Sequence, residues 1–243
     1  MRRRRDIRPQ QVYGVTQRGN QGQWVSLGRQ DFRKWIDIMR KCARRYEVRV
    51  HGYCLMHDHG HWMFEASTAE SISNVMRDMQ SQYSRYLNQR YREEPWRLIC
   101  ALGTQVCPPH LSAYRKSGPV NWTPRFDSES LDSTAFAAFL RYIENNPVSA
   151  GIVAGATDWE WSSARAHGTG VDTENVLDLD PWRNVFHQPD TILKDWKDFV
   201  GRPVEKAKAN EARVAQWSTG SAHNRPRSWV RPAVRRSAGA PPG

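Results

Sequence analysis

Residues 51–65 read His-Gly-Tyr-Cys-Leu-Met-His-Asp-His-Gly-His-Trp-Met-Phe-Glu, and this stretch decides the fold. Side chains on both sides of His57-Asp58 follow the two-residue period of β-strands, and the dipeptide itself indicates a tight turn. We therefore predict strands at 47–56 and 59–65 that pair as a β-hairpin.

The second strand of this hairpin carries two histidines at a two-residue spacing. Because residues two apart in a strand point to the same side, His59 and His61 project together from one face, and Trp62 and Phe64 project from the other. Two imidazoles at this spacing can bind one divalent ion without a change in the backbone. The alternative is that both are ordinary polar positions of a strand.

Two further histidines compete for the role of metal ligand. We place His57 in the turn, where it is exposed, and His51 on the neighbouring strand. Both are weaker candidates than His59 and His61.

Working outward from the hairpin, the sequence alternates between strand and helix patterns. Apolar residues recur at helical or strand spacing, with Gly and Pro at the breaks. The order β-α-β-β-α-β-α is typical of an α+β, ferredoxin-like split βαβ fold, with an antiparallel sheet, two helices on one face and a last helix for the other. The predicted elements are strands at 11–17 and near 121–126, helices at 29–46 and 71–92, and a helix from Ser133 to about Asn146, before Pro147.

The chain divides by composition into four parts. Residues 1–10 form a basic arm, 11–165 the main domain, and 166–202 an extension expected to pack on that domain. Residues 203–243 are rich in Ala, Arg, Pro and Gly and are predicted to be a basic disordered tail.

The charge balance favours a polyanionic partner. The 36 Lys and Arg outnumber the 25 Asp and Glu, for a formal net charge of +11, which suits nucleic acid or an anionic membrane surface. No apolar run is long enough for a membrane span or a signal peptide, and Cys42 and Cys54 lie in apolar patterns as core thiols, so we expect a reducing, cytoplasmic and nucleoid-associated setting. The candidate phosphate contacts are Arg2, Arg3, Arg4, Arg5, Arg18, Arg77, Arg85 and Arg125, with Arg90 and Arg92 on the same helix as Arg77.

The last predicted helix holds a second set of candidates. At about 100° per residue, Tyr142 and Asn146 lie one turn apart on the flank of an apolar stripe, so a phenol and a carboxamide can reach one cleft. The alternative is that Tyr142 is a boundary residue of the helix and that Asn146-Pro147 is only a helix stop.

Five ordered stretches resemble the REP-associated tyrosine transposases. These are relatives of the insertion-sequence-200 transposases and belong to the HUH (His-hydrophobic-His) single-strand endonucleases. The matching stretches cover about residues 10–165 and are Tyr13 to Asn20, Val48 to Phe64, Trp122 to Phe126, Arg141 to Val153, and Trp161-Ser162-Ser163.

The resemblance implies a role for each candidate. Tyr142 is implied to be the nucleophile, and His59, His61 and Asn146 the ligands of a divalent ion, Mg²⁺ or Mn²⁺ by the oxygen-rich set that phosphate and water would complete. The implied partner is single-stranded DNA with a hairpin, cut through a 5′-phosphotyrosine intermediate by a homodimer. The chain departs from the family at Gly60, where an apolar residue is usual, and at His57-Asp58, where Pro-Asn is usual. Gly60 is expected to cost packing and metal affinity.

Three other functions stay open at this stage. One is a replication-initiator or relaxase-like nicking protein, although 243 residues leave no room for the larger domains of such proteins. Another is a hairpin-binding regulator with weakened catalysis, which Gly60 would explain. The third is a structural metal protein, which needs a fourth closed ligand that the sequence does not offer.

Overall fold

A computed structural model describes residues 6–93, 122–180 and 200. Three predicted features lie outside the described residues: the contacts Arg2 to Arg5, the whole 95–120 loop and the 203–243 tail. No described helix combines the length and the apolar character that a bilayer span requires.

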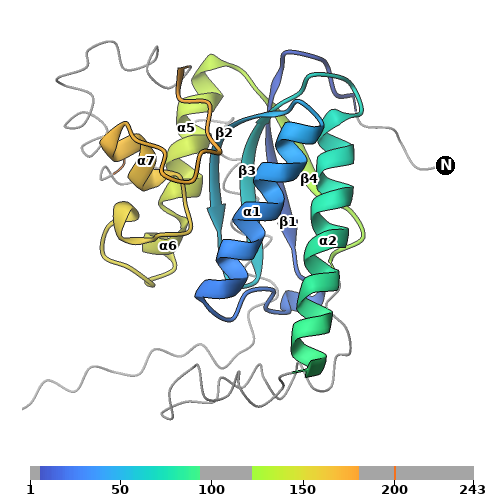
Figure 1. Cartoon of the computed structure of the whole chain (residues 1–243). Helices are drawn as coiled ribbons and strands as arrows, with labels where there is room; N and C mark the ends of the chain where they lie inside the picture. Colours follow the sequence, from blue (N-terminus) through green and yellow to red (C-terminus); the bar gives the residue numbers. More distant parts are fainter. Residues whose placement is uncertain (1–5, 94–121, 181–199, 201–243) are drawn as a thin grey trace, which may run out of the picture. The chain divides into compact units, whose positions relative to one another are not determined.

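A four-stranded antiparallel sheet forms the centre of the domain. It contains β1 (Val12–Arg18), β2 (Arg49–Leu55), β3 (His59–Glu65) and β4 (Asp127–Leu131), in the spatial order β2-β3-β1-β4. Figure 1 shows this sheet between its helices. The order is that of the split βαβ arrangement, so the predicted ferredoxin-like α+β fold is confirmed.

Helices α1 (Arg29–Arg45) and α2 (Ser71–Glu93) cover one face of the sheet (Figure 1). Their apolar stripes meet the strands through a cluster of rings. Trp35 of α1 stacks on Tyr83 of α2 with ring centroids 4.8 Å apart, and it meets Trp62 of β3 edge-on at 5.8 Å. All three side chains are fully buried, and large apolar burial of this kind is the main stabilising term of a small domain.

Helix α5 (Ser133–Glu144) packs on the other face, as predicted for the last helix. Two glycines allow the close approach. A Cβ atom on Gly14 of β1 would lie 2.7 Å from the ring of Phe139, and one on Gly52 of β2 would lie 2.5 Å from Leu140. The absence of side chains at these two positions therefore lets α5 pack directly on the sheet, over β1, β2 and β3.

The chain after α5 covers the outer edge of β2. It forms α6 (Asn146–Ser149), the 3-10 turn η2 (Ala156–Asp158) and α7 (Ala164–Thr169). The Leu55 amide donates to the carbonyl of Trp161 at 2.8 Å, and the Asp178 amide donates to the carbonyl of Val50 at 2.8 Å. The edge is thus paired with the following chain, which removes a site for edge-to-edge association.

Two predicted elements differ from the structure. The strand predicted near 121–126 is wrong, because the fourth strand spans Asp127–Leu131 and Trp122 makes only an isolated bridge to Gly19. The last helix ends at Glu144 instead of Asn146. The Asn145 amide caps it by donating to the carbonyl of Arg141, and Asn146 then begins α6 with Pro147 in its first turn.

Candidate active site

The two histidines of β3 lie side by side on the face that α5 covers. The rings of His59 and His61 have centroids 4.8 Å apart and are nearly perpendicular. Both side chains are buried. Their neighbours across the strand pair are Arg18, opposite His59, and Thr16, opposite His61. The predicted common orientation of the pair is present.

Hydrogen bonds fix the orientation of each imidazole. The Thr16 hydroxyl lies 2.8 Å from Nδ1 of His61, and Asp58 Oδ1 lies 2.5 Å from Nδ1 of His59. In both rings the bond engages Nδ1 and leaves Nε2 as the nitrogen that can bind a metal. A partner on the second ring nitrogen is the usual way in which proteins orient metal-binding histidines.

Asn146 reaches the same point from the other side. Its side-chain amide lies 3.0 Å from Nε2 of His61, measured to Nδ2, and a half-turn of the amide exchanges this nitrogen for Oδ1. The start of α6 therefore brings a carboxamide to the imidazole pair. It does so although the helix break separates Asn146 from α5.

These residues fit a divalent ion with open coordination positions. Burial lowers the pKa of His61 well below its ordinary value, with the charges of His59 and Arg18 adding to the effect, so the ring is neutral as a ligand must be. Among residues 6–93 and 122–180, no group of three His, Cys, Asp or Glu side chains is arranged to hold a metal ion, so two imidazoles and one amide are the available donors. A set this small leaves room for phosphate and water, as a catalytic site requires and a closed structural site does not.

Tyr142 of α5 faces the histidine pair. Its ring lies edge-on to His61, with centroids 5.6 Å apart, and next to Phe139 on its own helix at 6.0 Å. Burial raises the pKa of the Tyr142 phenol, while the positive charge of Arg18 and a hydrogen bond with Asn146 oppose that rise. The predicted phenol, carboxamide and imidazoles thus meet in one place.

Asp58 and Arg18 extend the polar surroundings of His59. An Arg18 nitrogen lies 3.3 Å from Asp58 Oδ2. Burial raises the pKa of Asp58, but the nearby His59 and Arg18 outweigh it and bring that pKa down to about 2. Asp58 is therefore a carboxylate at neutral pH and can hold the His59 ring.

The chain was also compared with known proteins. A family model for IS200-like transposases matches residues 27–99, which include α1, both histidines of the pair and α2. Over these residues the chain is similar to the IS200-like transposases. No curated protein matches the chain.

Two solved structures that resemble the chain at low identity are described as transposases. One is a REP-associated tyrosine transposase bound to a REP hairpin, at 17% identity and a TM-score of 0.49, over 74% of this chain and 96% of that one. A crystal structure from Deinococcus radiodurans R1, also described as a transposase, has 18% identity and a TM-score of 0.34 over 60% of this chain and 97% of that one.

A buried anchor holds the C-terminal end of α5, which carries Tyr142. Glu144 is fully buried, and its Oε1 accepts hydrogen bonds from the Ser163 hydroxyl at 2.5 Å and from Nδ1 of His167 at 2.6 Å. The amide of Tyr53 in β2 donates to the Ser163 oxygen at 3.1 Å. Residue-by-residue reasoning missed this set, since its members are far apart in sequence and His167 lies outside the stretches with a family resemblance.

Gly60 between the two histidines is closely packed. A Cβ atom there would lie 2.5 Å from the ring of Trp62 and 3.2 Å from the ring of Trp35. The expected loss of packing at Gly60 is therefore wrong, because two tryptophans fill the volume that an apolar side chain would take.

Most of the remaining candidates lie away from the imidazole pair. His51 is buried on β2, where its Nε2 bonds Glu65 at 2.9 Å. The expected exposure of His57 is wrong, because its ring stacks on Trp24 at 4.6 Å. Among the predicted arginines, Arg18 lies at the pair, Arg85 is exposed on α2, and Arg77 and Arg125 line a separate groove.

Proposed function

We propose that this protein is a transposase that cleaves and rejoins single-stranded DNA, with Tyr142 as the nucleophile and His59, His61 and Asn146 as ligands of a divalent ion, Mg²⁺ or Mn²⁺. The observation that carries the proposal is the meeting of these groups. The ring of Tyr142 lies 5.6 Å from that of His61, and the Asn146 amide lies 3.0 Å from the His61 nitrogen, although they come from segments about 80 residues apart.

Each residue has a defined part in this chemistry. His59 and His61 would present their Nε2 atoms to the ion, and hydrogen bonds with Asp58 and Thr16 set the directions of the two rings. The bound ion would polarise the scissile phosphate and offset the charge that develops on it. Arg18, next to Asp58, adds positive charge where the DNA phosphate would lie.

The covalent step balances without a co-reactant. The Tyr142 oxygen bonds to phosphorus as the bond from phosphorus to the 3′-oxygen breaks, and the phenol proton passes through solvent to that oxygen. The product is a 5′-phosphotyrosine on one DNA end and a free 3′-hydroxyl on the other. One phosphoester bond forms as another breaks, so the bond energy is kept in the phosphotyrosine. A 3′-hydroxyl can therefore attack the phosphotyrosine and rejoin the strand without ATP.

The substrate we propose is DNA that carries a hairpin, acted on by a homodimer. The net charge of +11 supports a nucleic-acid partner. A similar solved structure is that of a transposase bound to a REP hairpin. The alternative of a regulator with weakened catalysis depended on loose packing at Gly60, and the close contacts of Gly60 with Trp62 and Trp35 do not favour it.

A covalent-adduct assay tests the proposal. The full chain is incubated with Mn²⁺ and a pool of hairpin oligonucleotides with randomised single-stranded flanks, labelled at either the 3′ or the 5′ end. We expect only the 3′ label to move with the protein on a denaturing gel, because the 5′-phosphotyrosine links the downstream fragment.

Two phenol variants are compared with the wild type in this assay. Tyr142→Phe should abolish the adduct and leave DNA binding intact. Tyr86→Phe is the matched control, since its hydroxyl is engaged by Asp31 and Arg90 elsewhere in the fold. An adduct that persists in Tyr142→Phe, or DNA binding with no adduct in the wild type, would refute the proposed reaction.

A further inference from the structure

The sheet holds the two imidazoles of the candidate site to different extents. His61 lies within β3 and has a register partner in both β1 and β2. His59 is the first residue of β3 and has a register partner only in β1, because the pairing with β2 begins at Gly60. The position of His59 therefore depends on the turn that precedes it.

This turn, residues 56–58, also carries the group that orients the His59 ring. The carboxylate of Asp58 lies 2.5 Å from Nδ1 of His59. The Met56 amide closes the turn by donating to the carbonyl of His59 at 2.8 Å. Both the place and the direction of the His59 ring thus follow from how the turn is held.

His57, in the middle of the turn, bonds the segment 23–27 that precedes α1 at three points. Its carbonyl accepts from the amides of Val25 at 2.6 Å and of Ser26 at 3.0 Å. Its ring nitrogen Nδ1 lies 2.7 Å from the carbonyl oxygen of Ser26. Because a carbonyl oxygen can only accept, Nδ1 carries the proton and donates it to this bond. The main chain and the side chain of one residue thus connect the turn to the segment 23–27.

The ring of His57 also packs among aromatic side chains. It stacks on Trp24 with centroids 4.6 Å apart, and it meets the rings of Phe32 at 5.3 Å and Trp159 at 5.9 Å edge-on. Such contacts bury apolar area and stabilise the fold. A hydrogen bond to one carbonyl adds a narrow distance and direction. The stacking and the hydrogen bond are therefore two separate contributions of the same ring.

Helix α2 supports the segment that His57 bonds. The hydroxyl of Tyr83, a fully buried residue of α2, donates to the carbonyl of Val25 at 2.8 Å. The same hydroxyl lies 2.6 Å from the hydroxyl of Ser26. The two residues that bond His57 are thus held from the other side by one side chain of α2.

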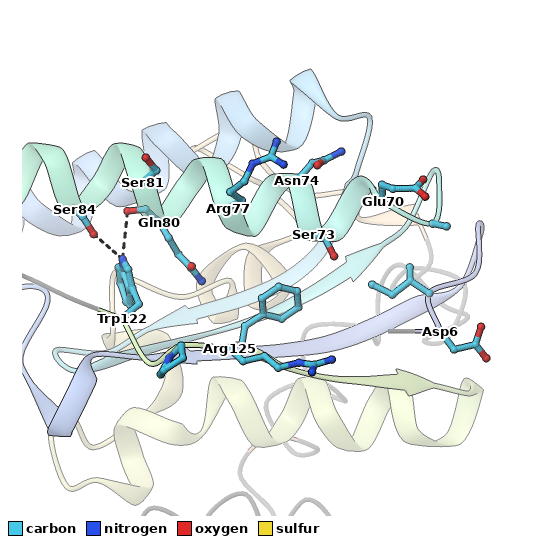
Figure 2. Close-up of a pocket in the computed structure, with 14 residues that line it drawn as sticks. Asp6, Glu70, Ser73, Asn74, Arg77, Gln80, Ser81, Ser84, Trp122 and Arg125 are labelled. Atoms are coloured by element: carbon cyan, nitrogen blue, oxygen red, sulfur yellow. Dashed lines mark hydrogen bonds between the residues drawn. The ribbon is translucent and has the colours of Figure 1, made fainter. Parts of the chain in front are cut away.

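The next residue of α2, Ser84, supports the turn by a second route. Figure 2 shows the indole of Trp122 bonded to α2, with its N–H 2.8 Å from the Ser84 hydroxyl. The residue after Trp122 donates its amide to the carbonyl of Arg18 at 2.9 Å, and the Gly19 amide donates to the carbonyl of Asp58 at 2.8 Å. The turn is therefore held at His57 and at Asp58 by contacts that both lead back to α2.

We propose that His57 is a positioning residue of the active site, whose ring hydrogen bond to Ser26 fixes the turn that places Asp58 and His59. This role rests on the proposed function in one respect, that His59 and His61 hold a divalent ion. A loose turn would carry Asp58 and His59 away from His61 together. Metal affinity would then fall, because the ligands would have to be ordered when the ion binds.

Two substitutions separate the hydrogen bond of His57 from its stacking. His57→Phe keeps a ring and loses the donor, whereas His57→Asn keeps a side-chain N–H close to the place of Nδ1 and loses the ring. We expect His57→Phe to weaken Co²⁺ binding about 10-fold and His57→Asn to weaken it by about threefold at most. His57→Asn should nevertheless lower the melting temperature more, because it leaves a gap among the aromatic side chains.

Co²⁺ titrations of the full chain, followed by visible absorption, measure the affinity, and a His61→Ala titration is subtracted to remove ions bound elsewhere. Tyr13→Phe is the matched control. It removes a hydroxyl that accepts from the Arg8 amide at 2.7 Å, near the other end of β1, and should lower the melting temperature without a change in Co²⁺ affinity. Affinities that follow the melting temperatures across the three variants would overturn the proposal, since His57 would then only stabilise the fold.

Amide hydrogen exchange of the metal-free protein tests the turn itself. We expect peptides that cover residues 19–27 to exchange faster in His57→Phe than in the wild type, when both are scaled to peptides of α1. Unchanged exchange would overturn the proposal, whatever the metal titrations give. Equal Co²⁺ binding by the wild type and His61→Ala would instead refute the metal site of the proposed function, and the exchange rates would still decide whether His57 holds the turn.

Discussion

The phenol ring of Tyr142 lies edge-on to the imidazole of His61, with ring centroids 5.6 Å apart. The two residues are 81 positions apart in sequence and belong to different layers of the fold, one to α5 and one to β3. Any nucleophilic role for the phenol depends on how firmly α5 is held over the sheet and on how the imidazoles are oriented.

Metal affinity should depend on the carboxylate behind His59. Replacing Asp58 by Asn removes the charge that holds Nδ1 of His59 at 2.5 Å and should weaken Mn²⁺ binding about 10- to 100-fold, as loss of such a partner usually does. Isothermal titration with Mn²⁺ measures the change. Asp37→Asn is the control, because Asp37 is also ion-paired, to Arg40 and Lys41, but lies on α1.

The anchor below Tyr142 should affect catalysis more than binding. Ser163→Ala removes the hydroxyl that bonds Glu144, two residues from Tyr142, and should lower the rate of adduct formation about 10-fold with little change in DNA affinity. Single-turnover adduct rates and fluorescence anisotropy give the two quantities, and Ser163→Thr, which keeps a hydroxyl, should recover part of the rate.

A buried pair elsewhere provides the comparison for the anchor. His51→Gln disturbs the bond from His51 to Glu65 at 2.9 Å, at a different part of β2. If Ser163→Ala and His51→Gln lower the adduct rate and the melting temperature in the same proportion, the anchor only stabilises the fold and does not position Tyr142.

Gly60 should not tolerate a side chain. Gly60→Val places atoms against the Trp62 ring and should cost about 1–3 kcal/mol of unfolding free energy through overpacking. Urea denaturation measures the loss. Because Trp62→Leu opens space at this point, the double variant should be more stable than the sum of the single effects predicts. Strict additivity would show that the two residues do not compete for the same volume.

Two buried thiols should react slowly in the folded protein. Burial raises the pKa of Cys42 to about 11 and that of Cys54 well above its ordinary value, so few thiolates form at pH 8. In a variant with Cys100 and Cys107 changed to Ser, iodoacetamide labelling of Cys42 should rise with pH up to about 11. Fast labelling at pH 8 without denaturant would contradict the burial of these residues.

The parts of the fold with a strong hydrophobic period could be predicted from the sequence. Both helices on the outer layer and the hairpin 49–65 follow from apolar spacing, since one face of each element is buried. The same reasoning placed His59 and His61 on one face. It also identified Tyr142 and Asn146 as groups that could share a cleft.

Other features depend on contacts that no local pattern records. Strand β4 reads Asp-Ser-Glu-Ser-Leu, which has almost no apolar alternation, and among the described residues it pairs only with β1, at the edge of the sheet. The anchor joins Glu144 to Ser163 and His167, which approach only after the chain has turned through α6 and η2. Such arrangements follow from the tertiary fold alone.

The fit of Gly60 between Trp62 and Trp35 affects how relatives of this domain should be sought. A sequence pattern that requires an apolar residue between the two histidines would miss this chain, although Trp62 and Trp35 already occupy the volume of such a side chain. A pattern that scores the pair of tryptophans together with the histidines would retrieve it. Sequences with glycine at this position and a large aromatic ring two residues later should therefore be tested for the proposed activity before they are classed as inactive.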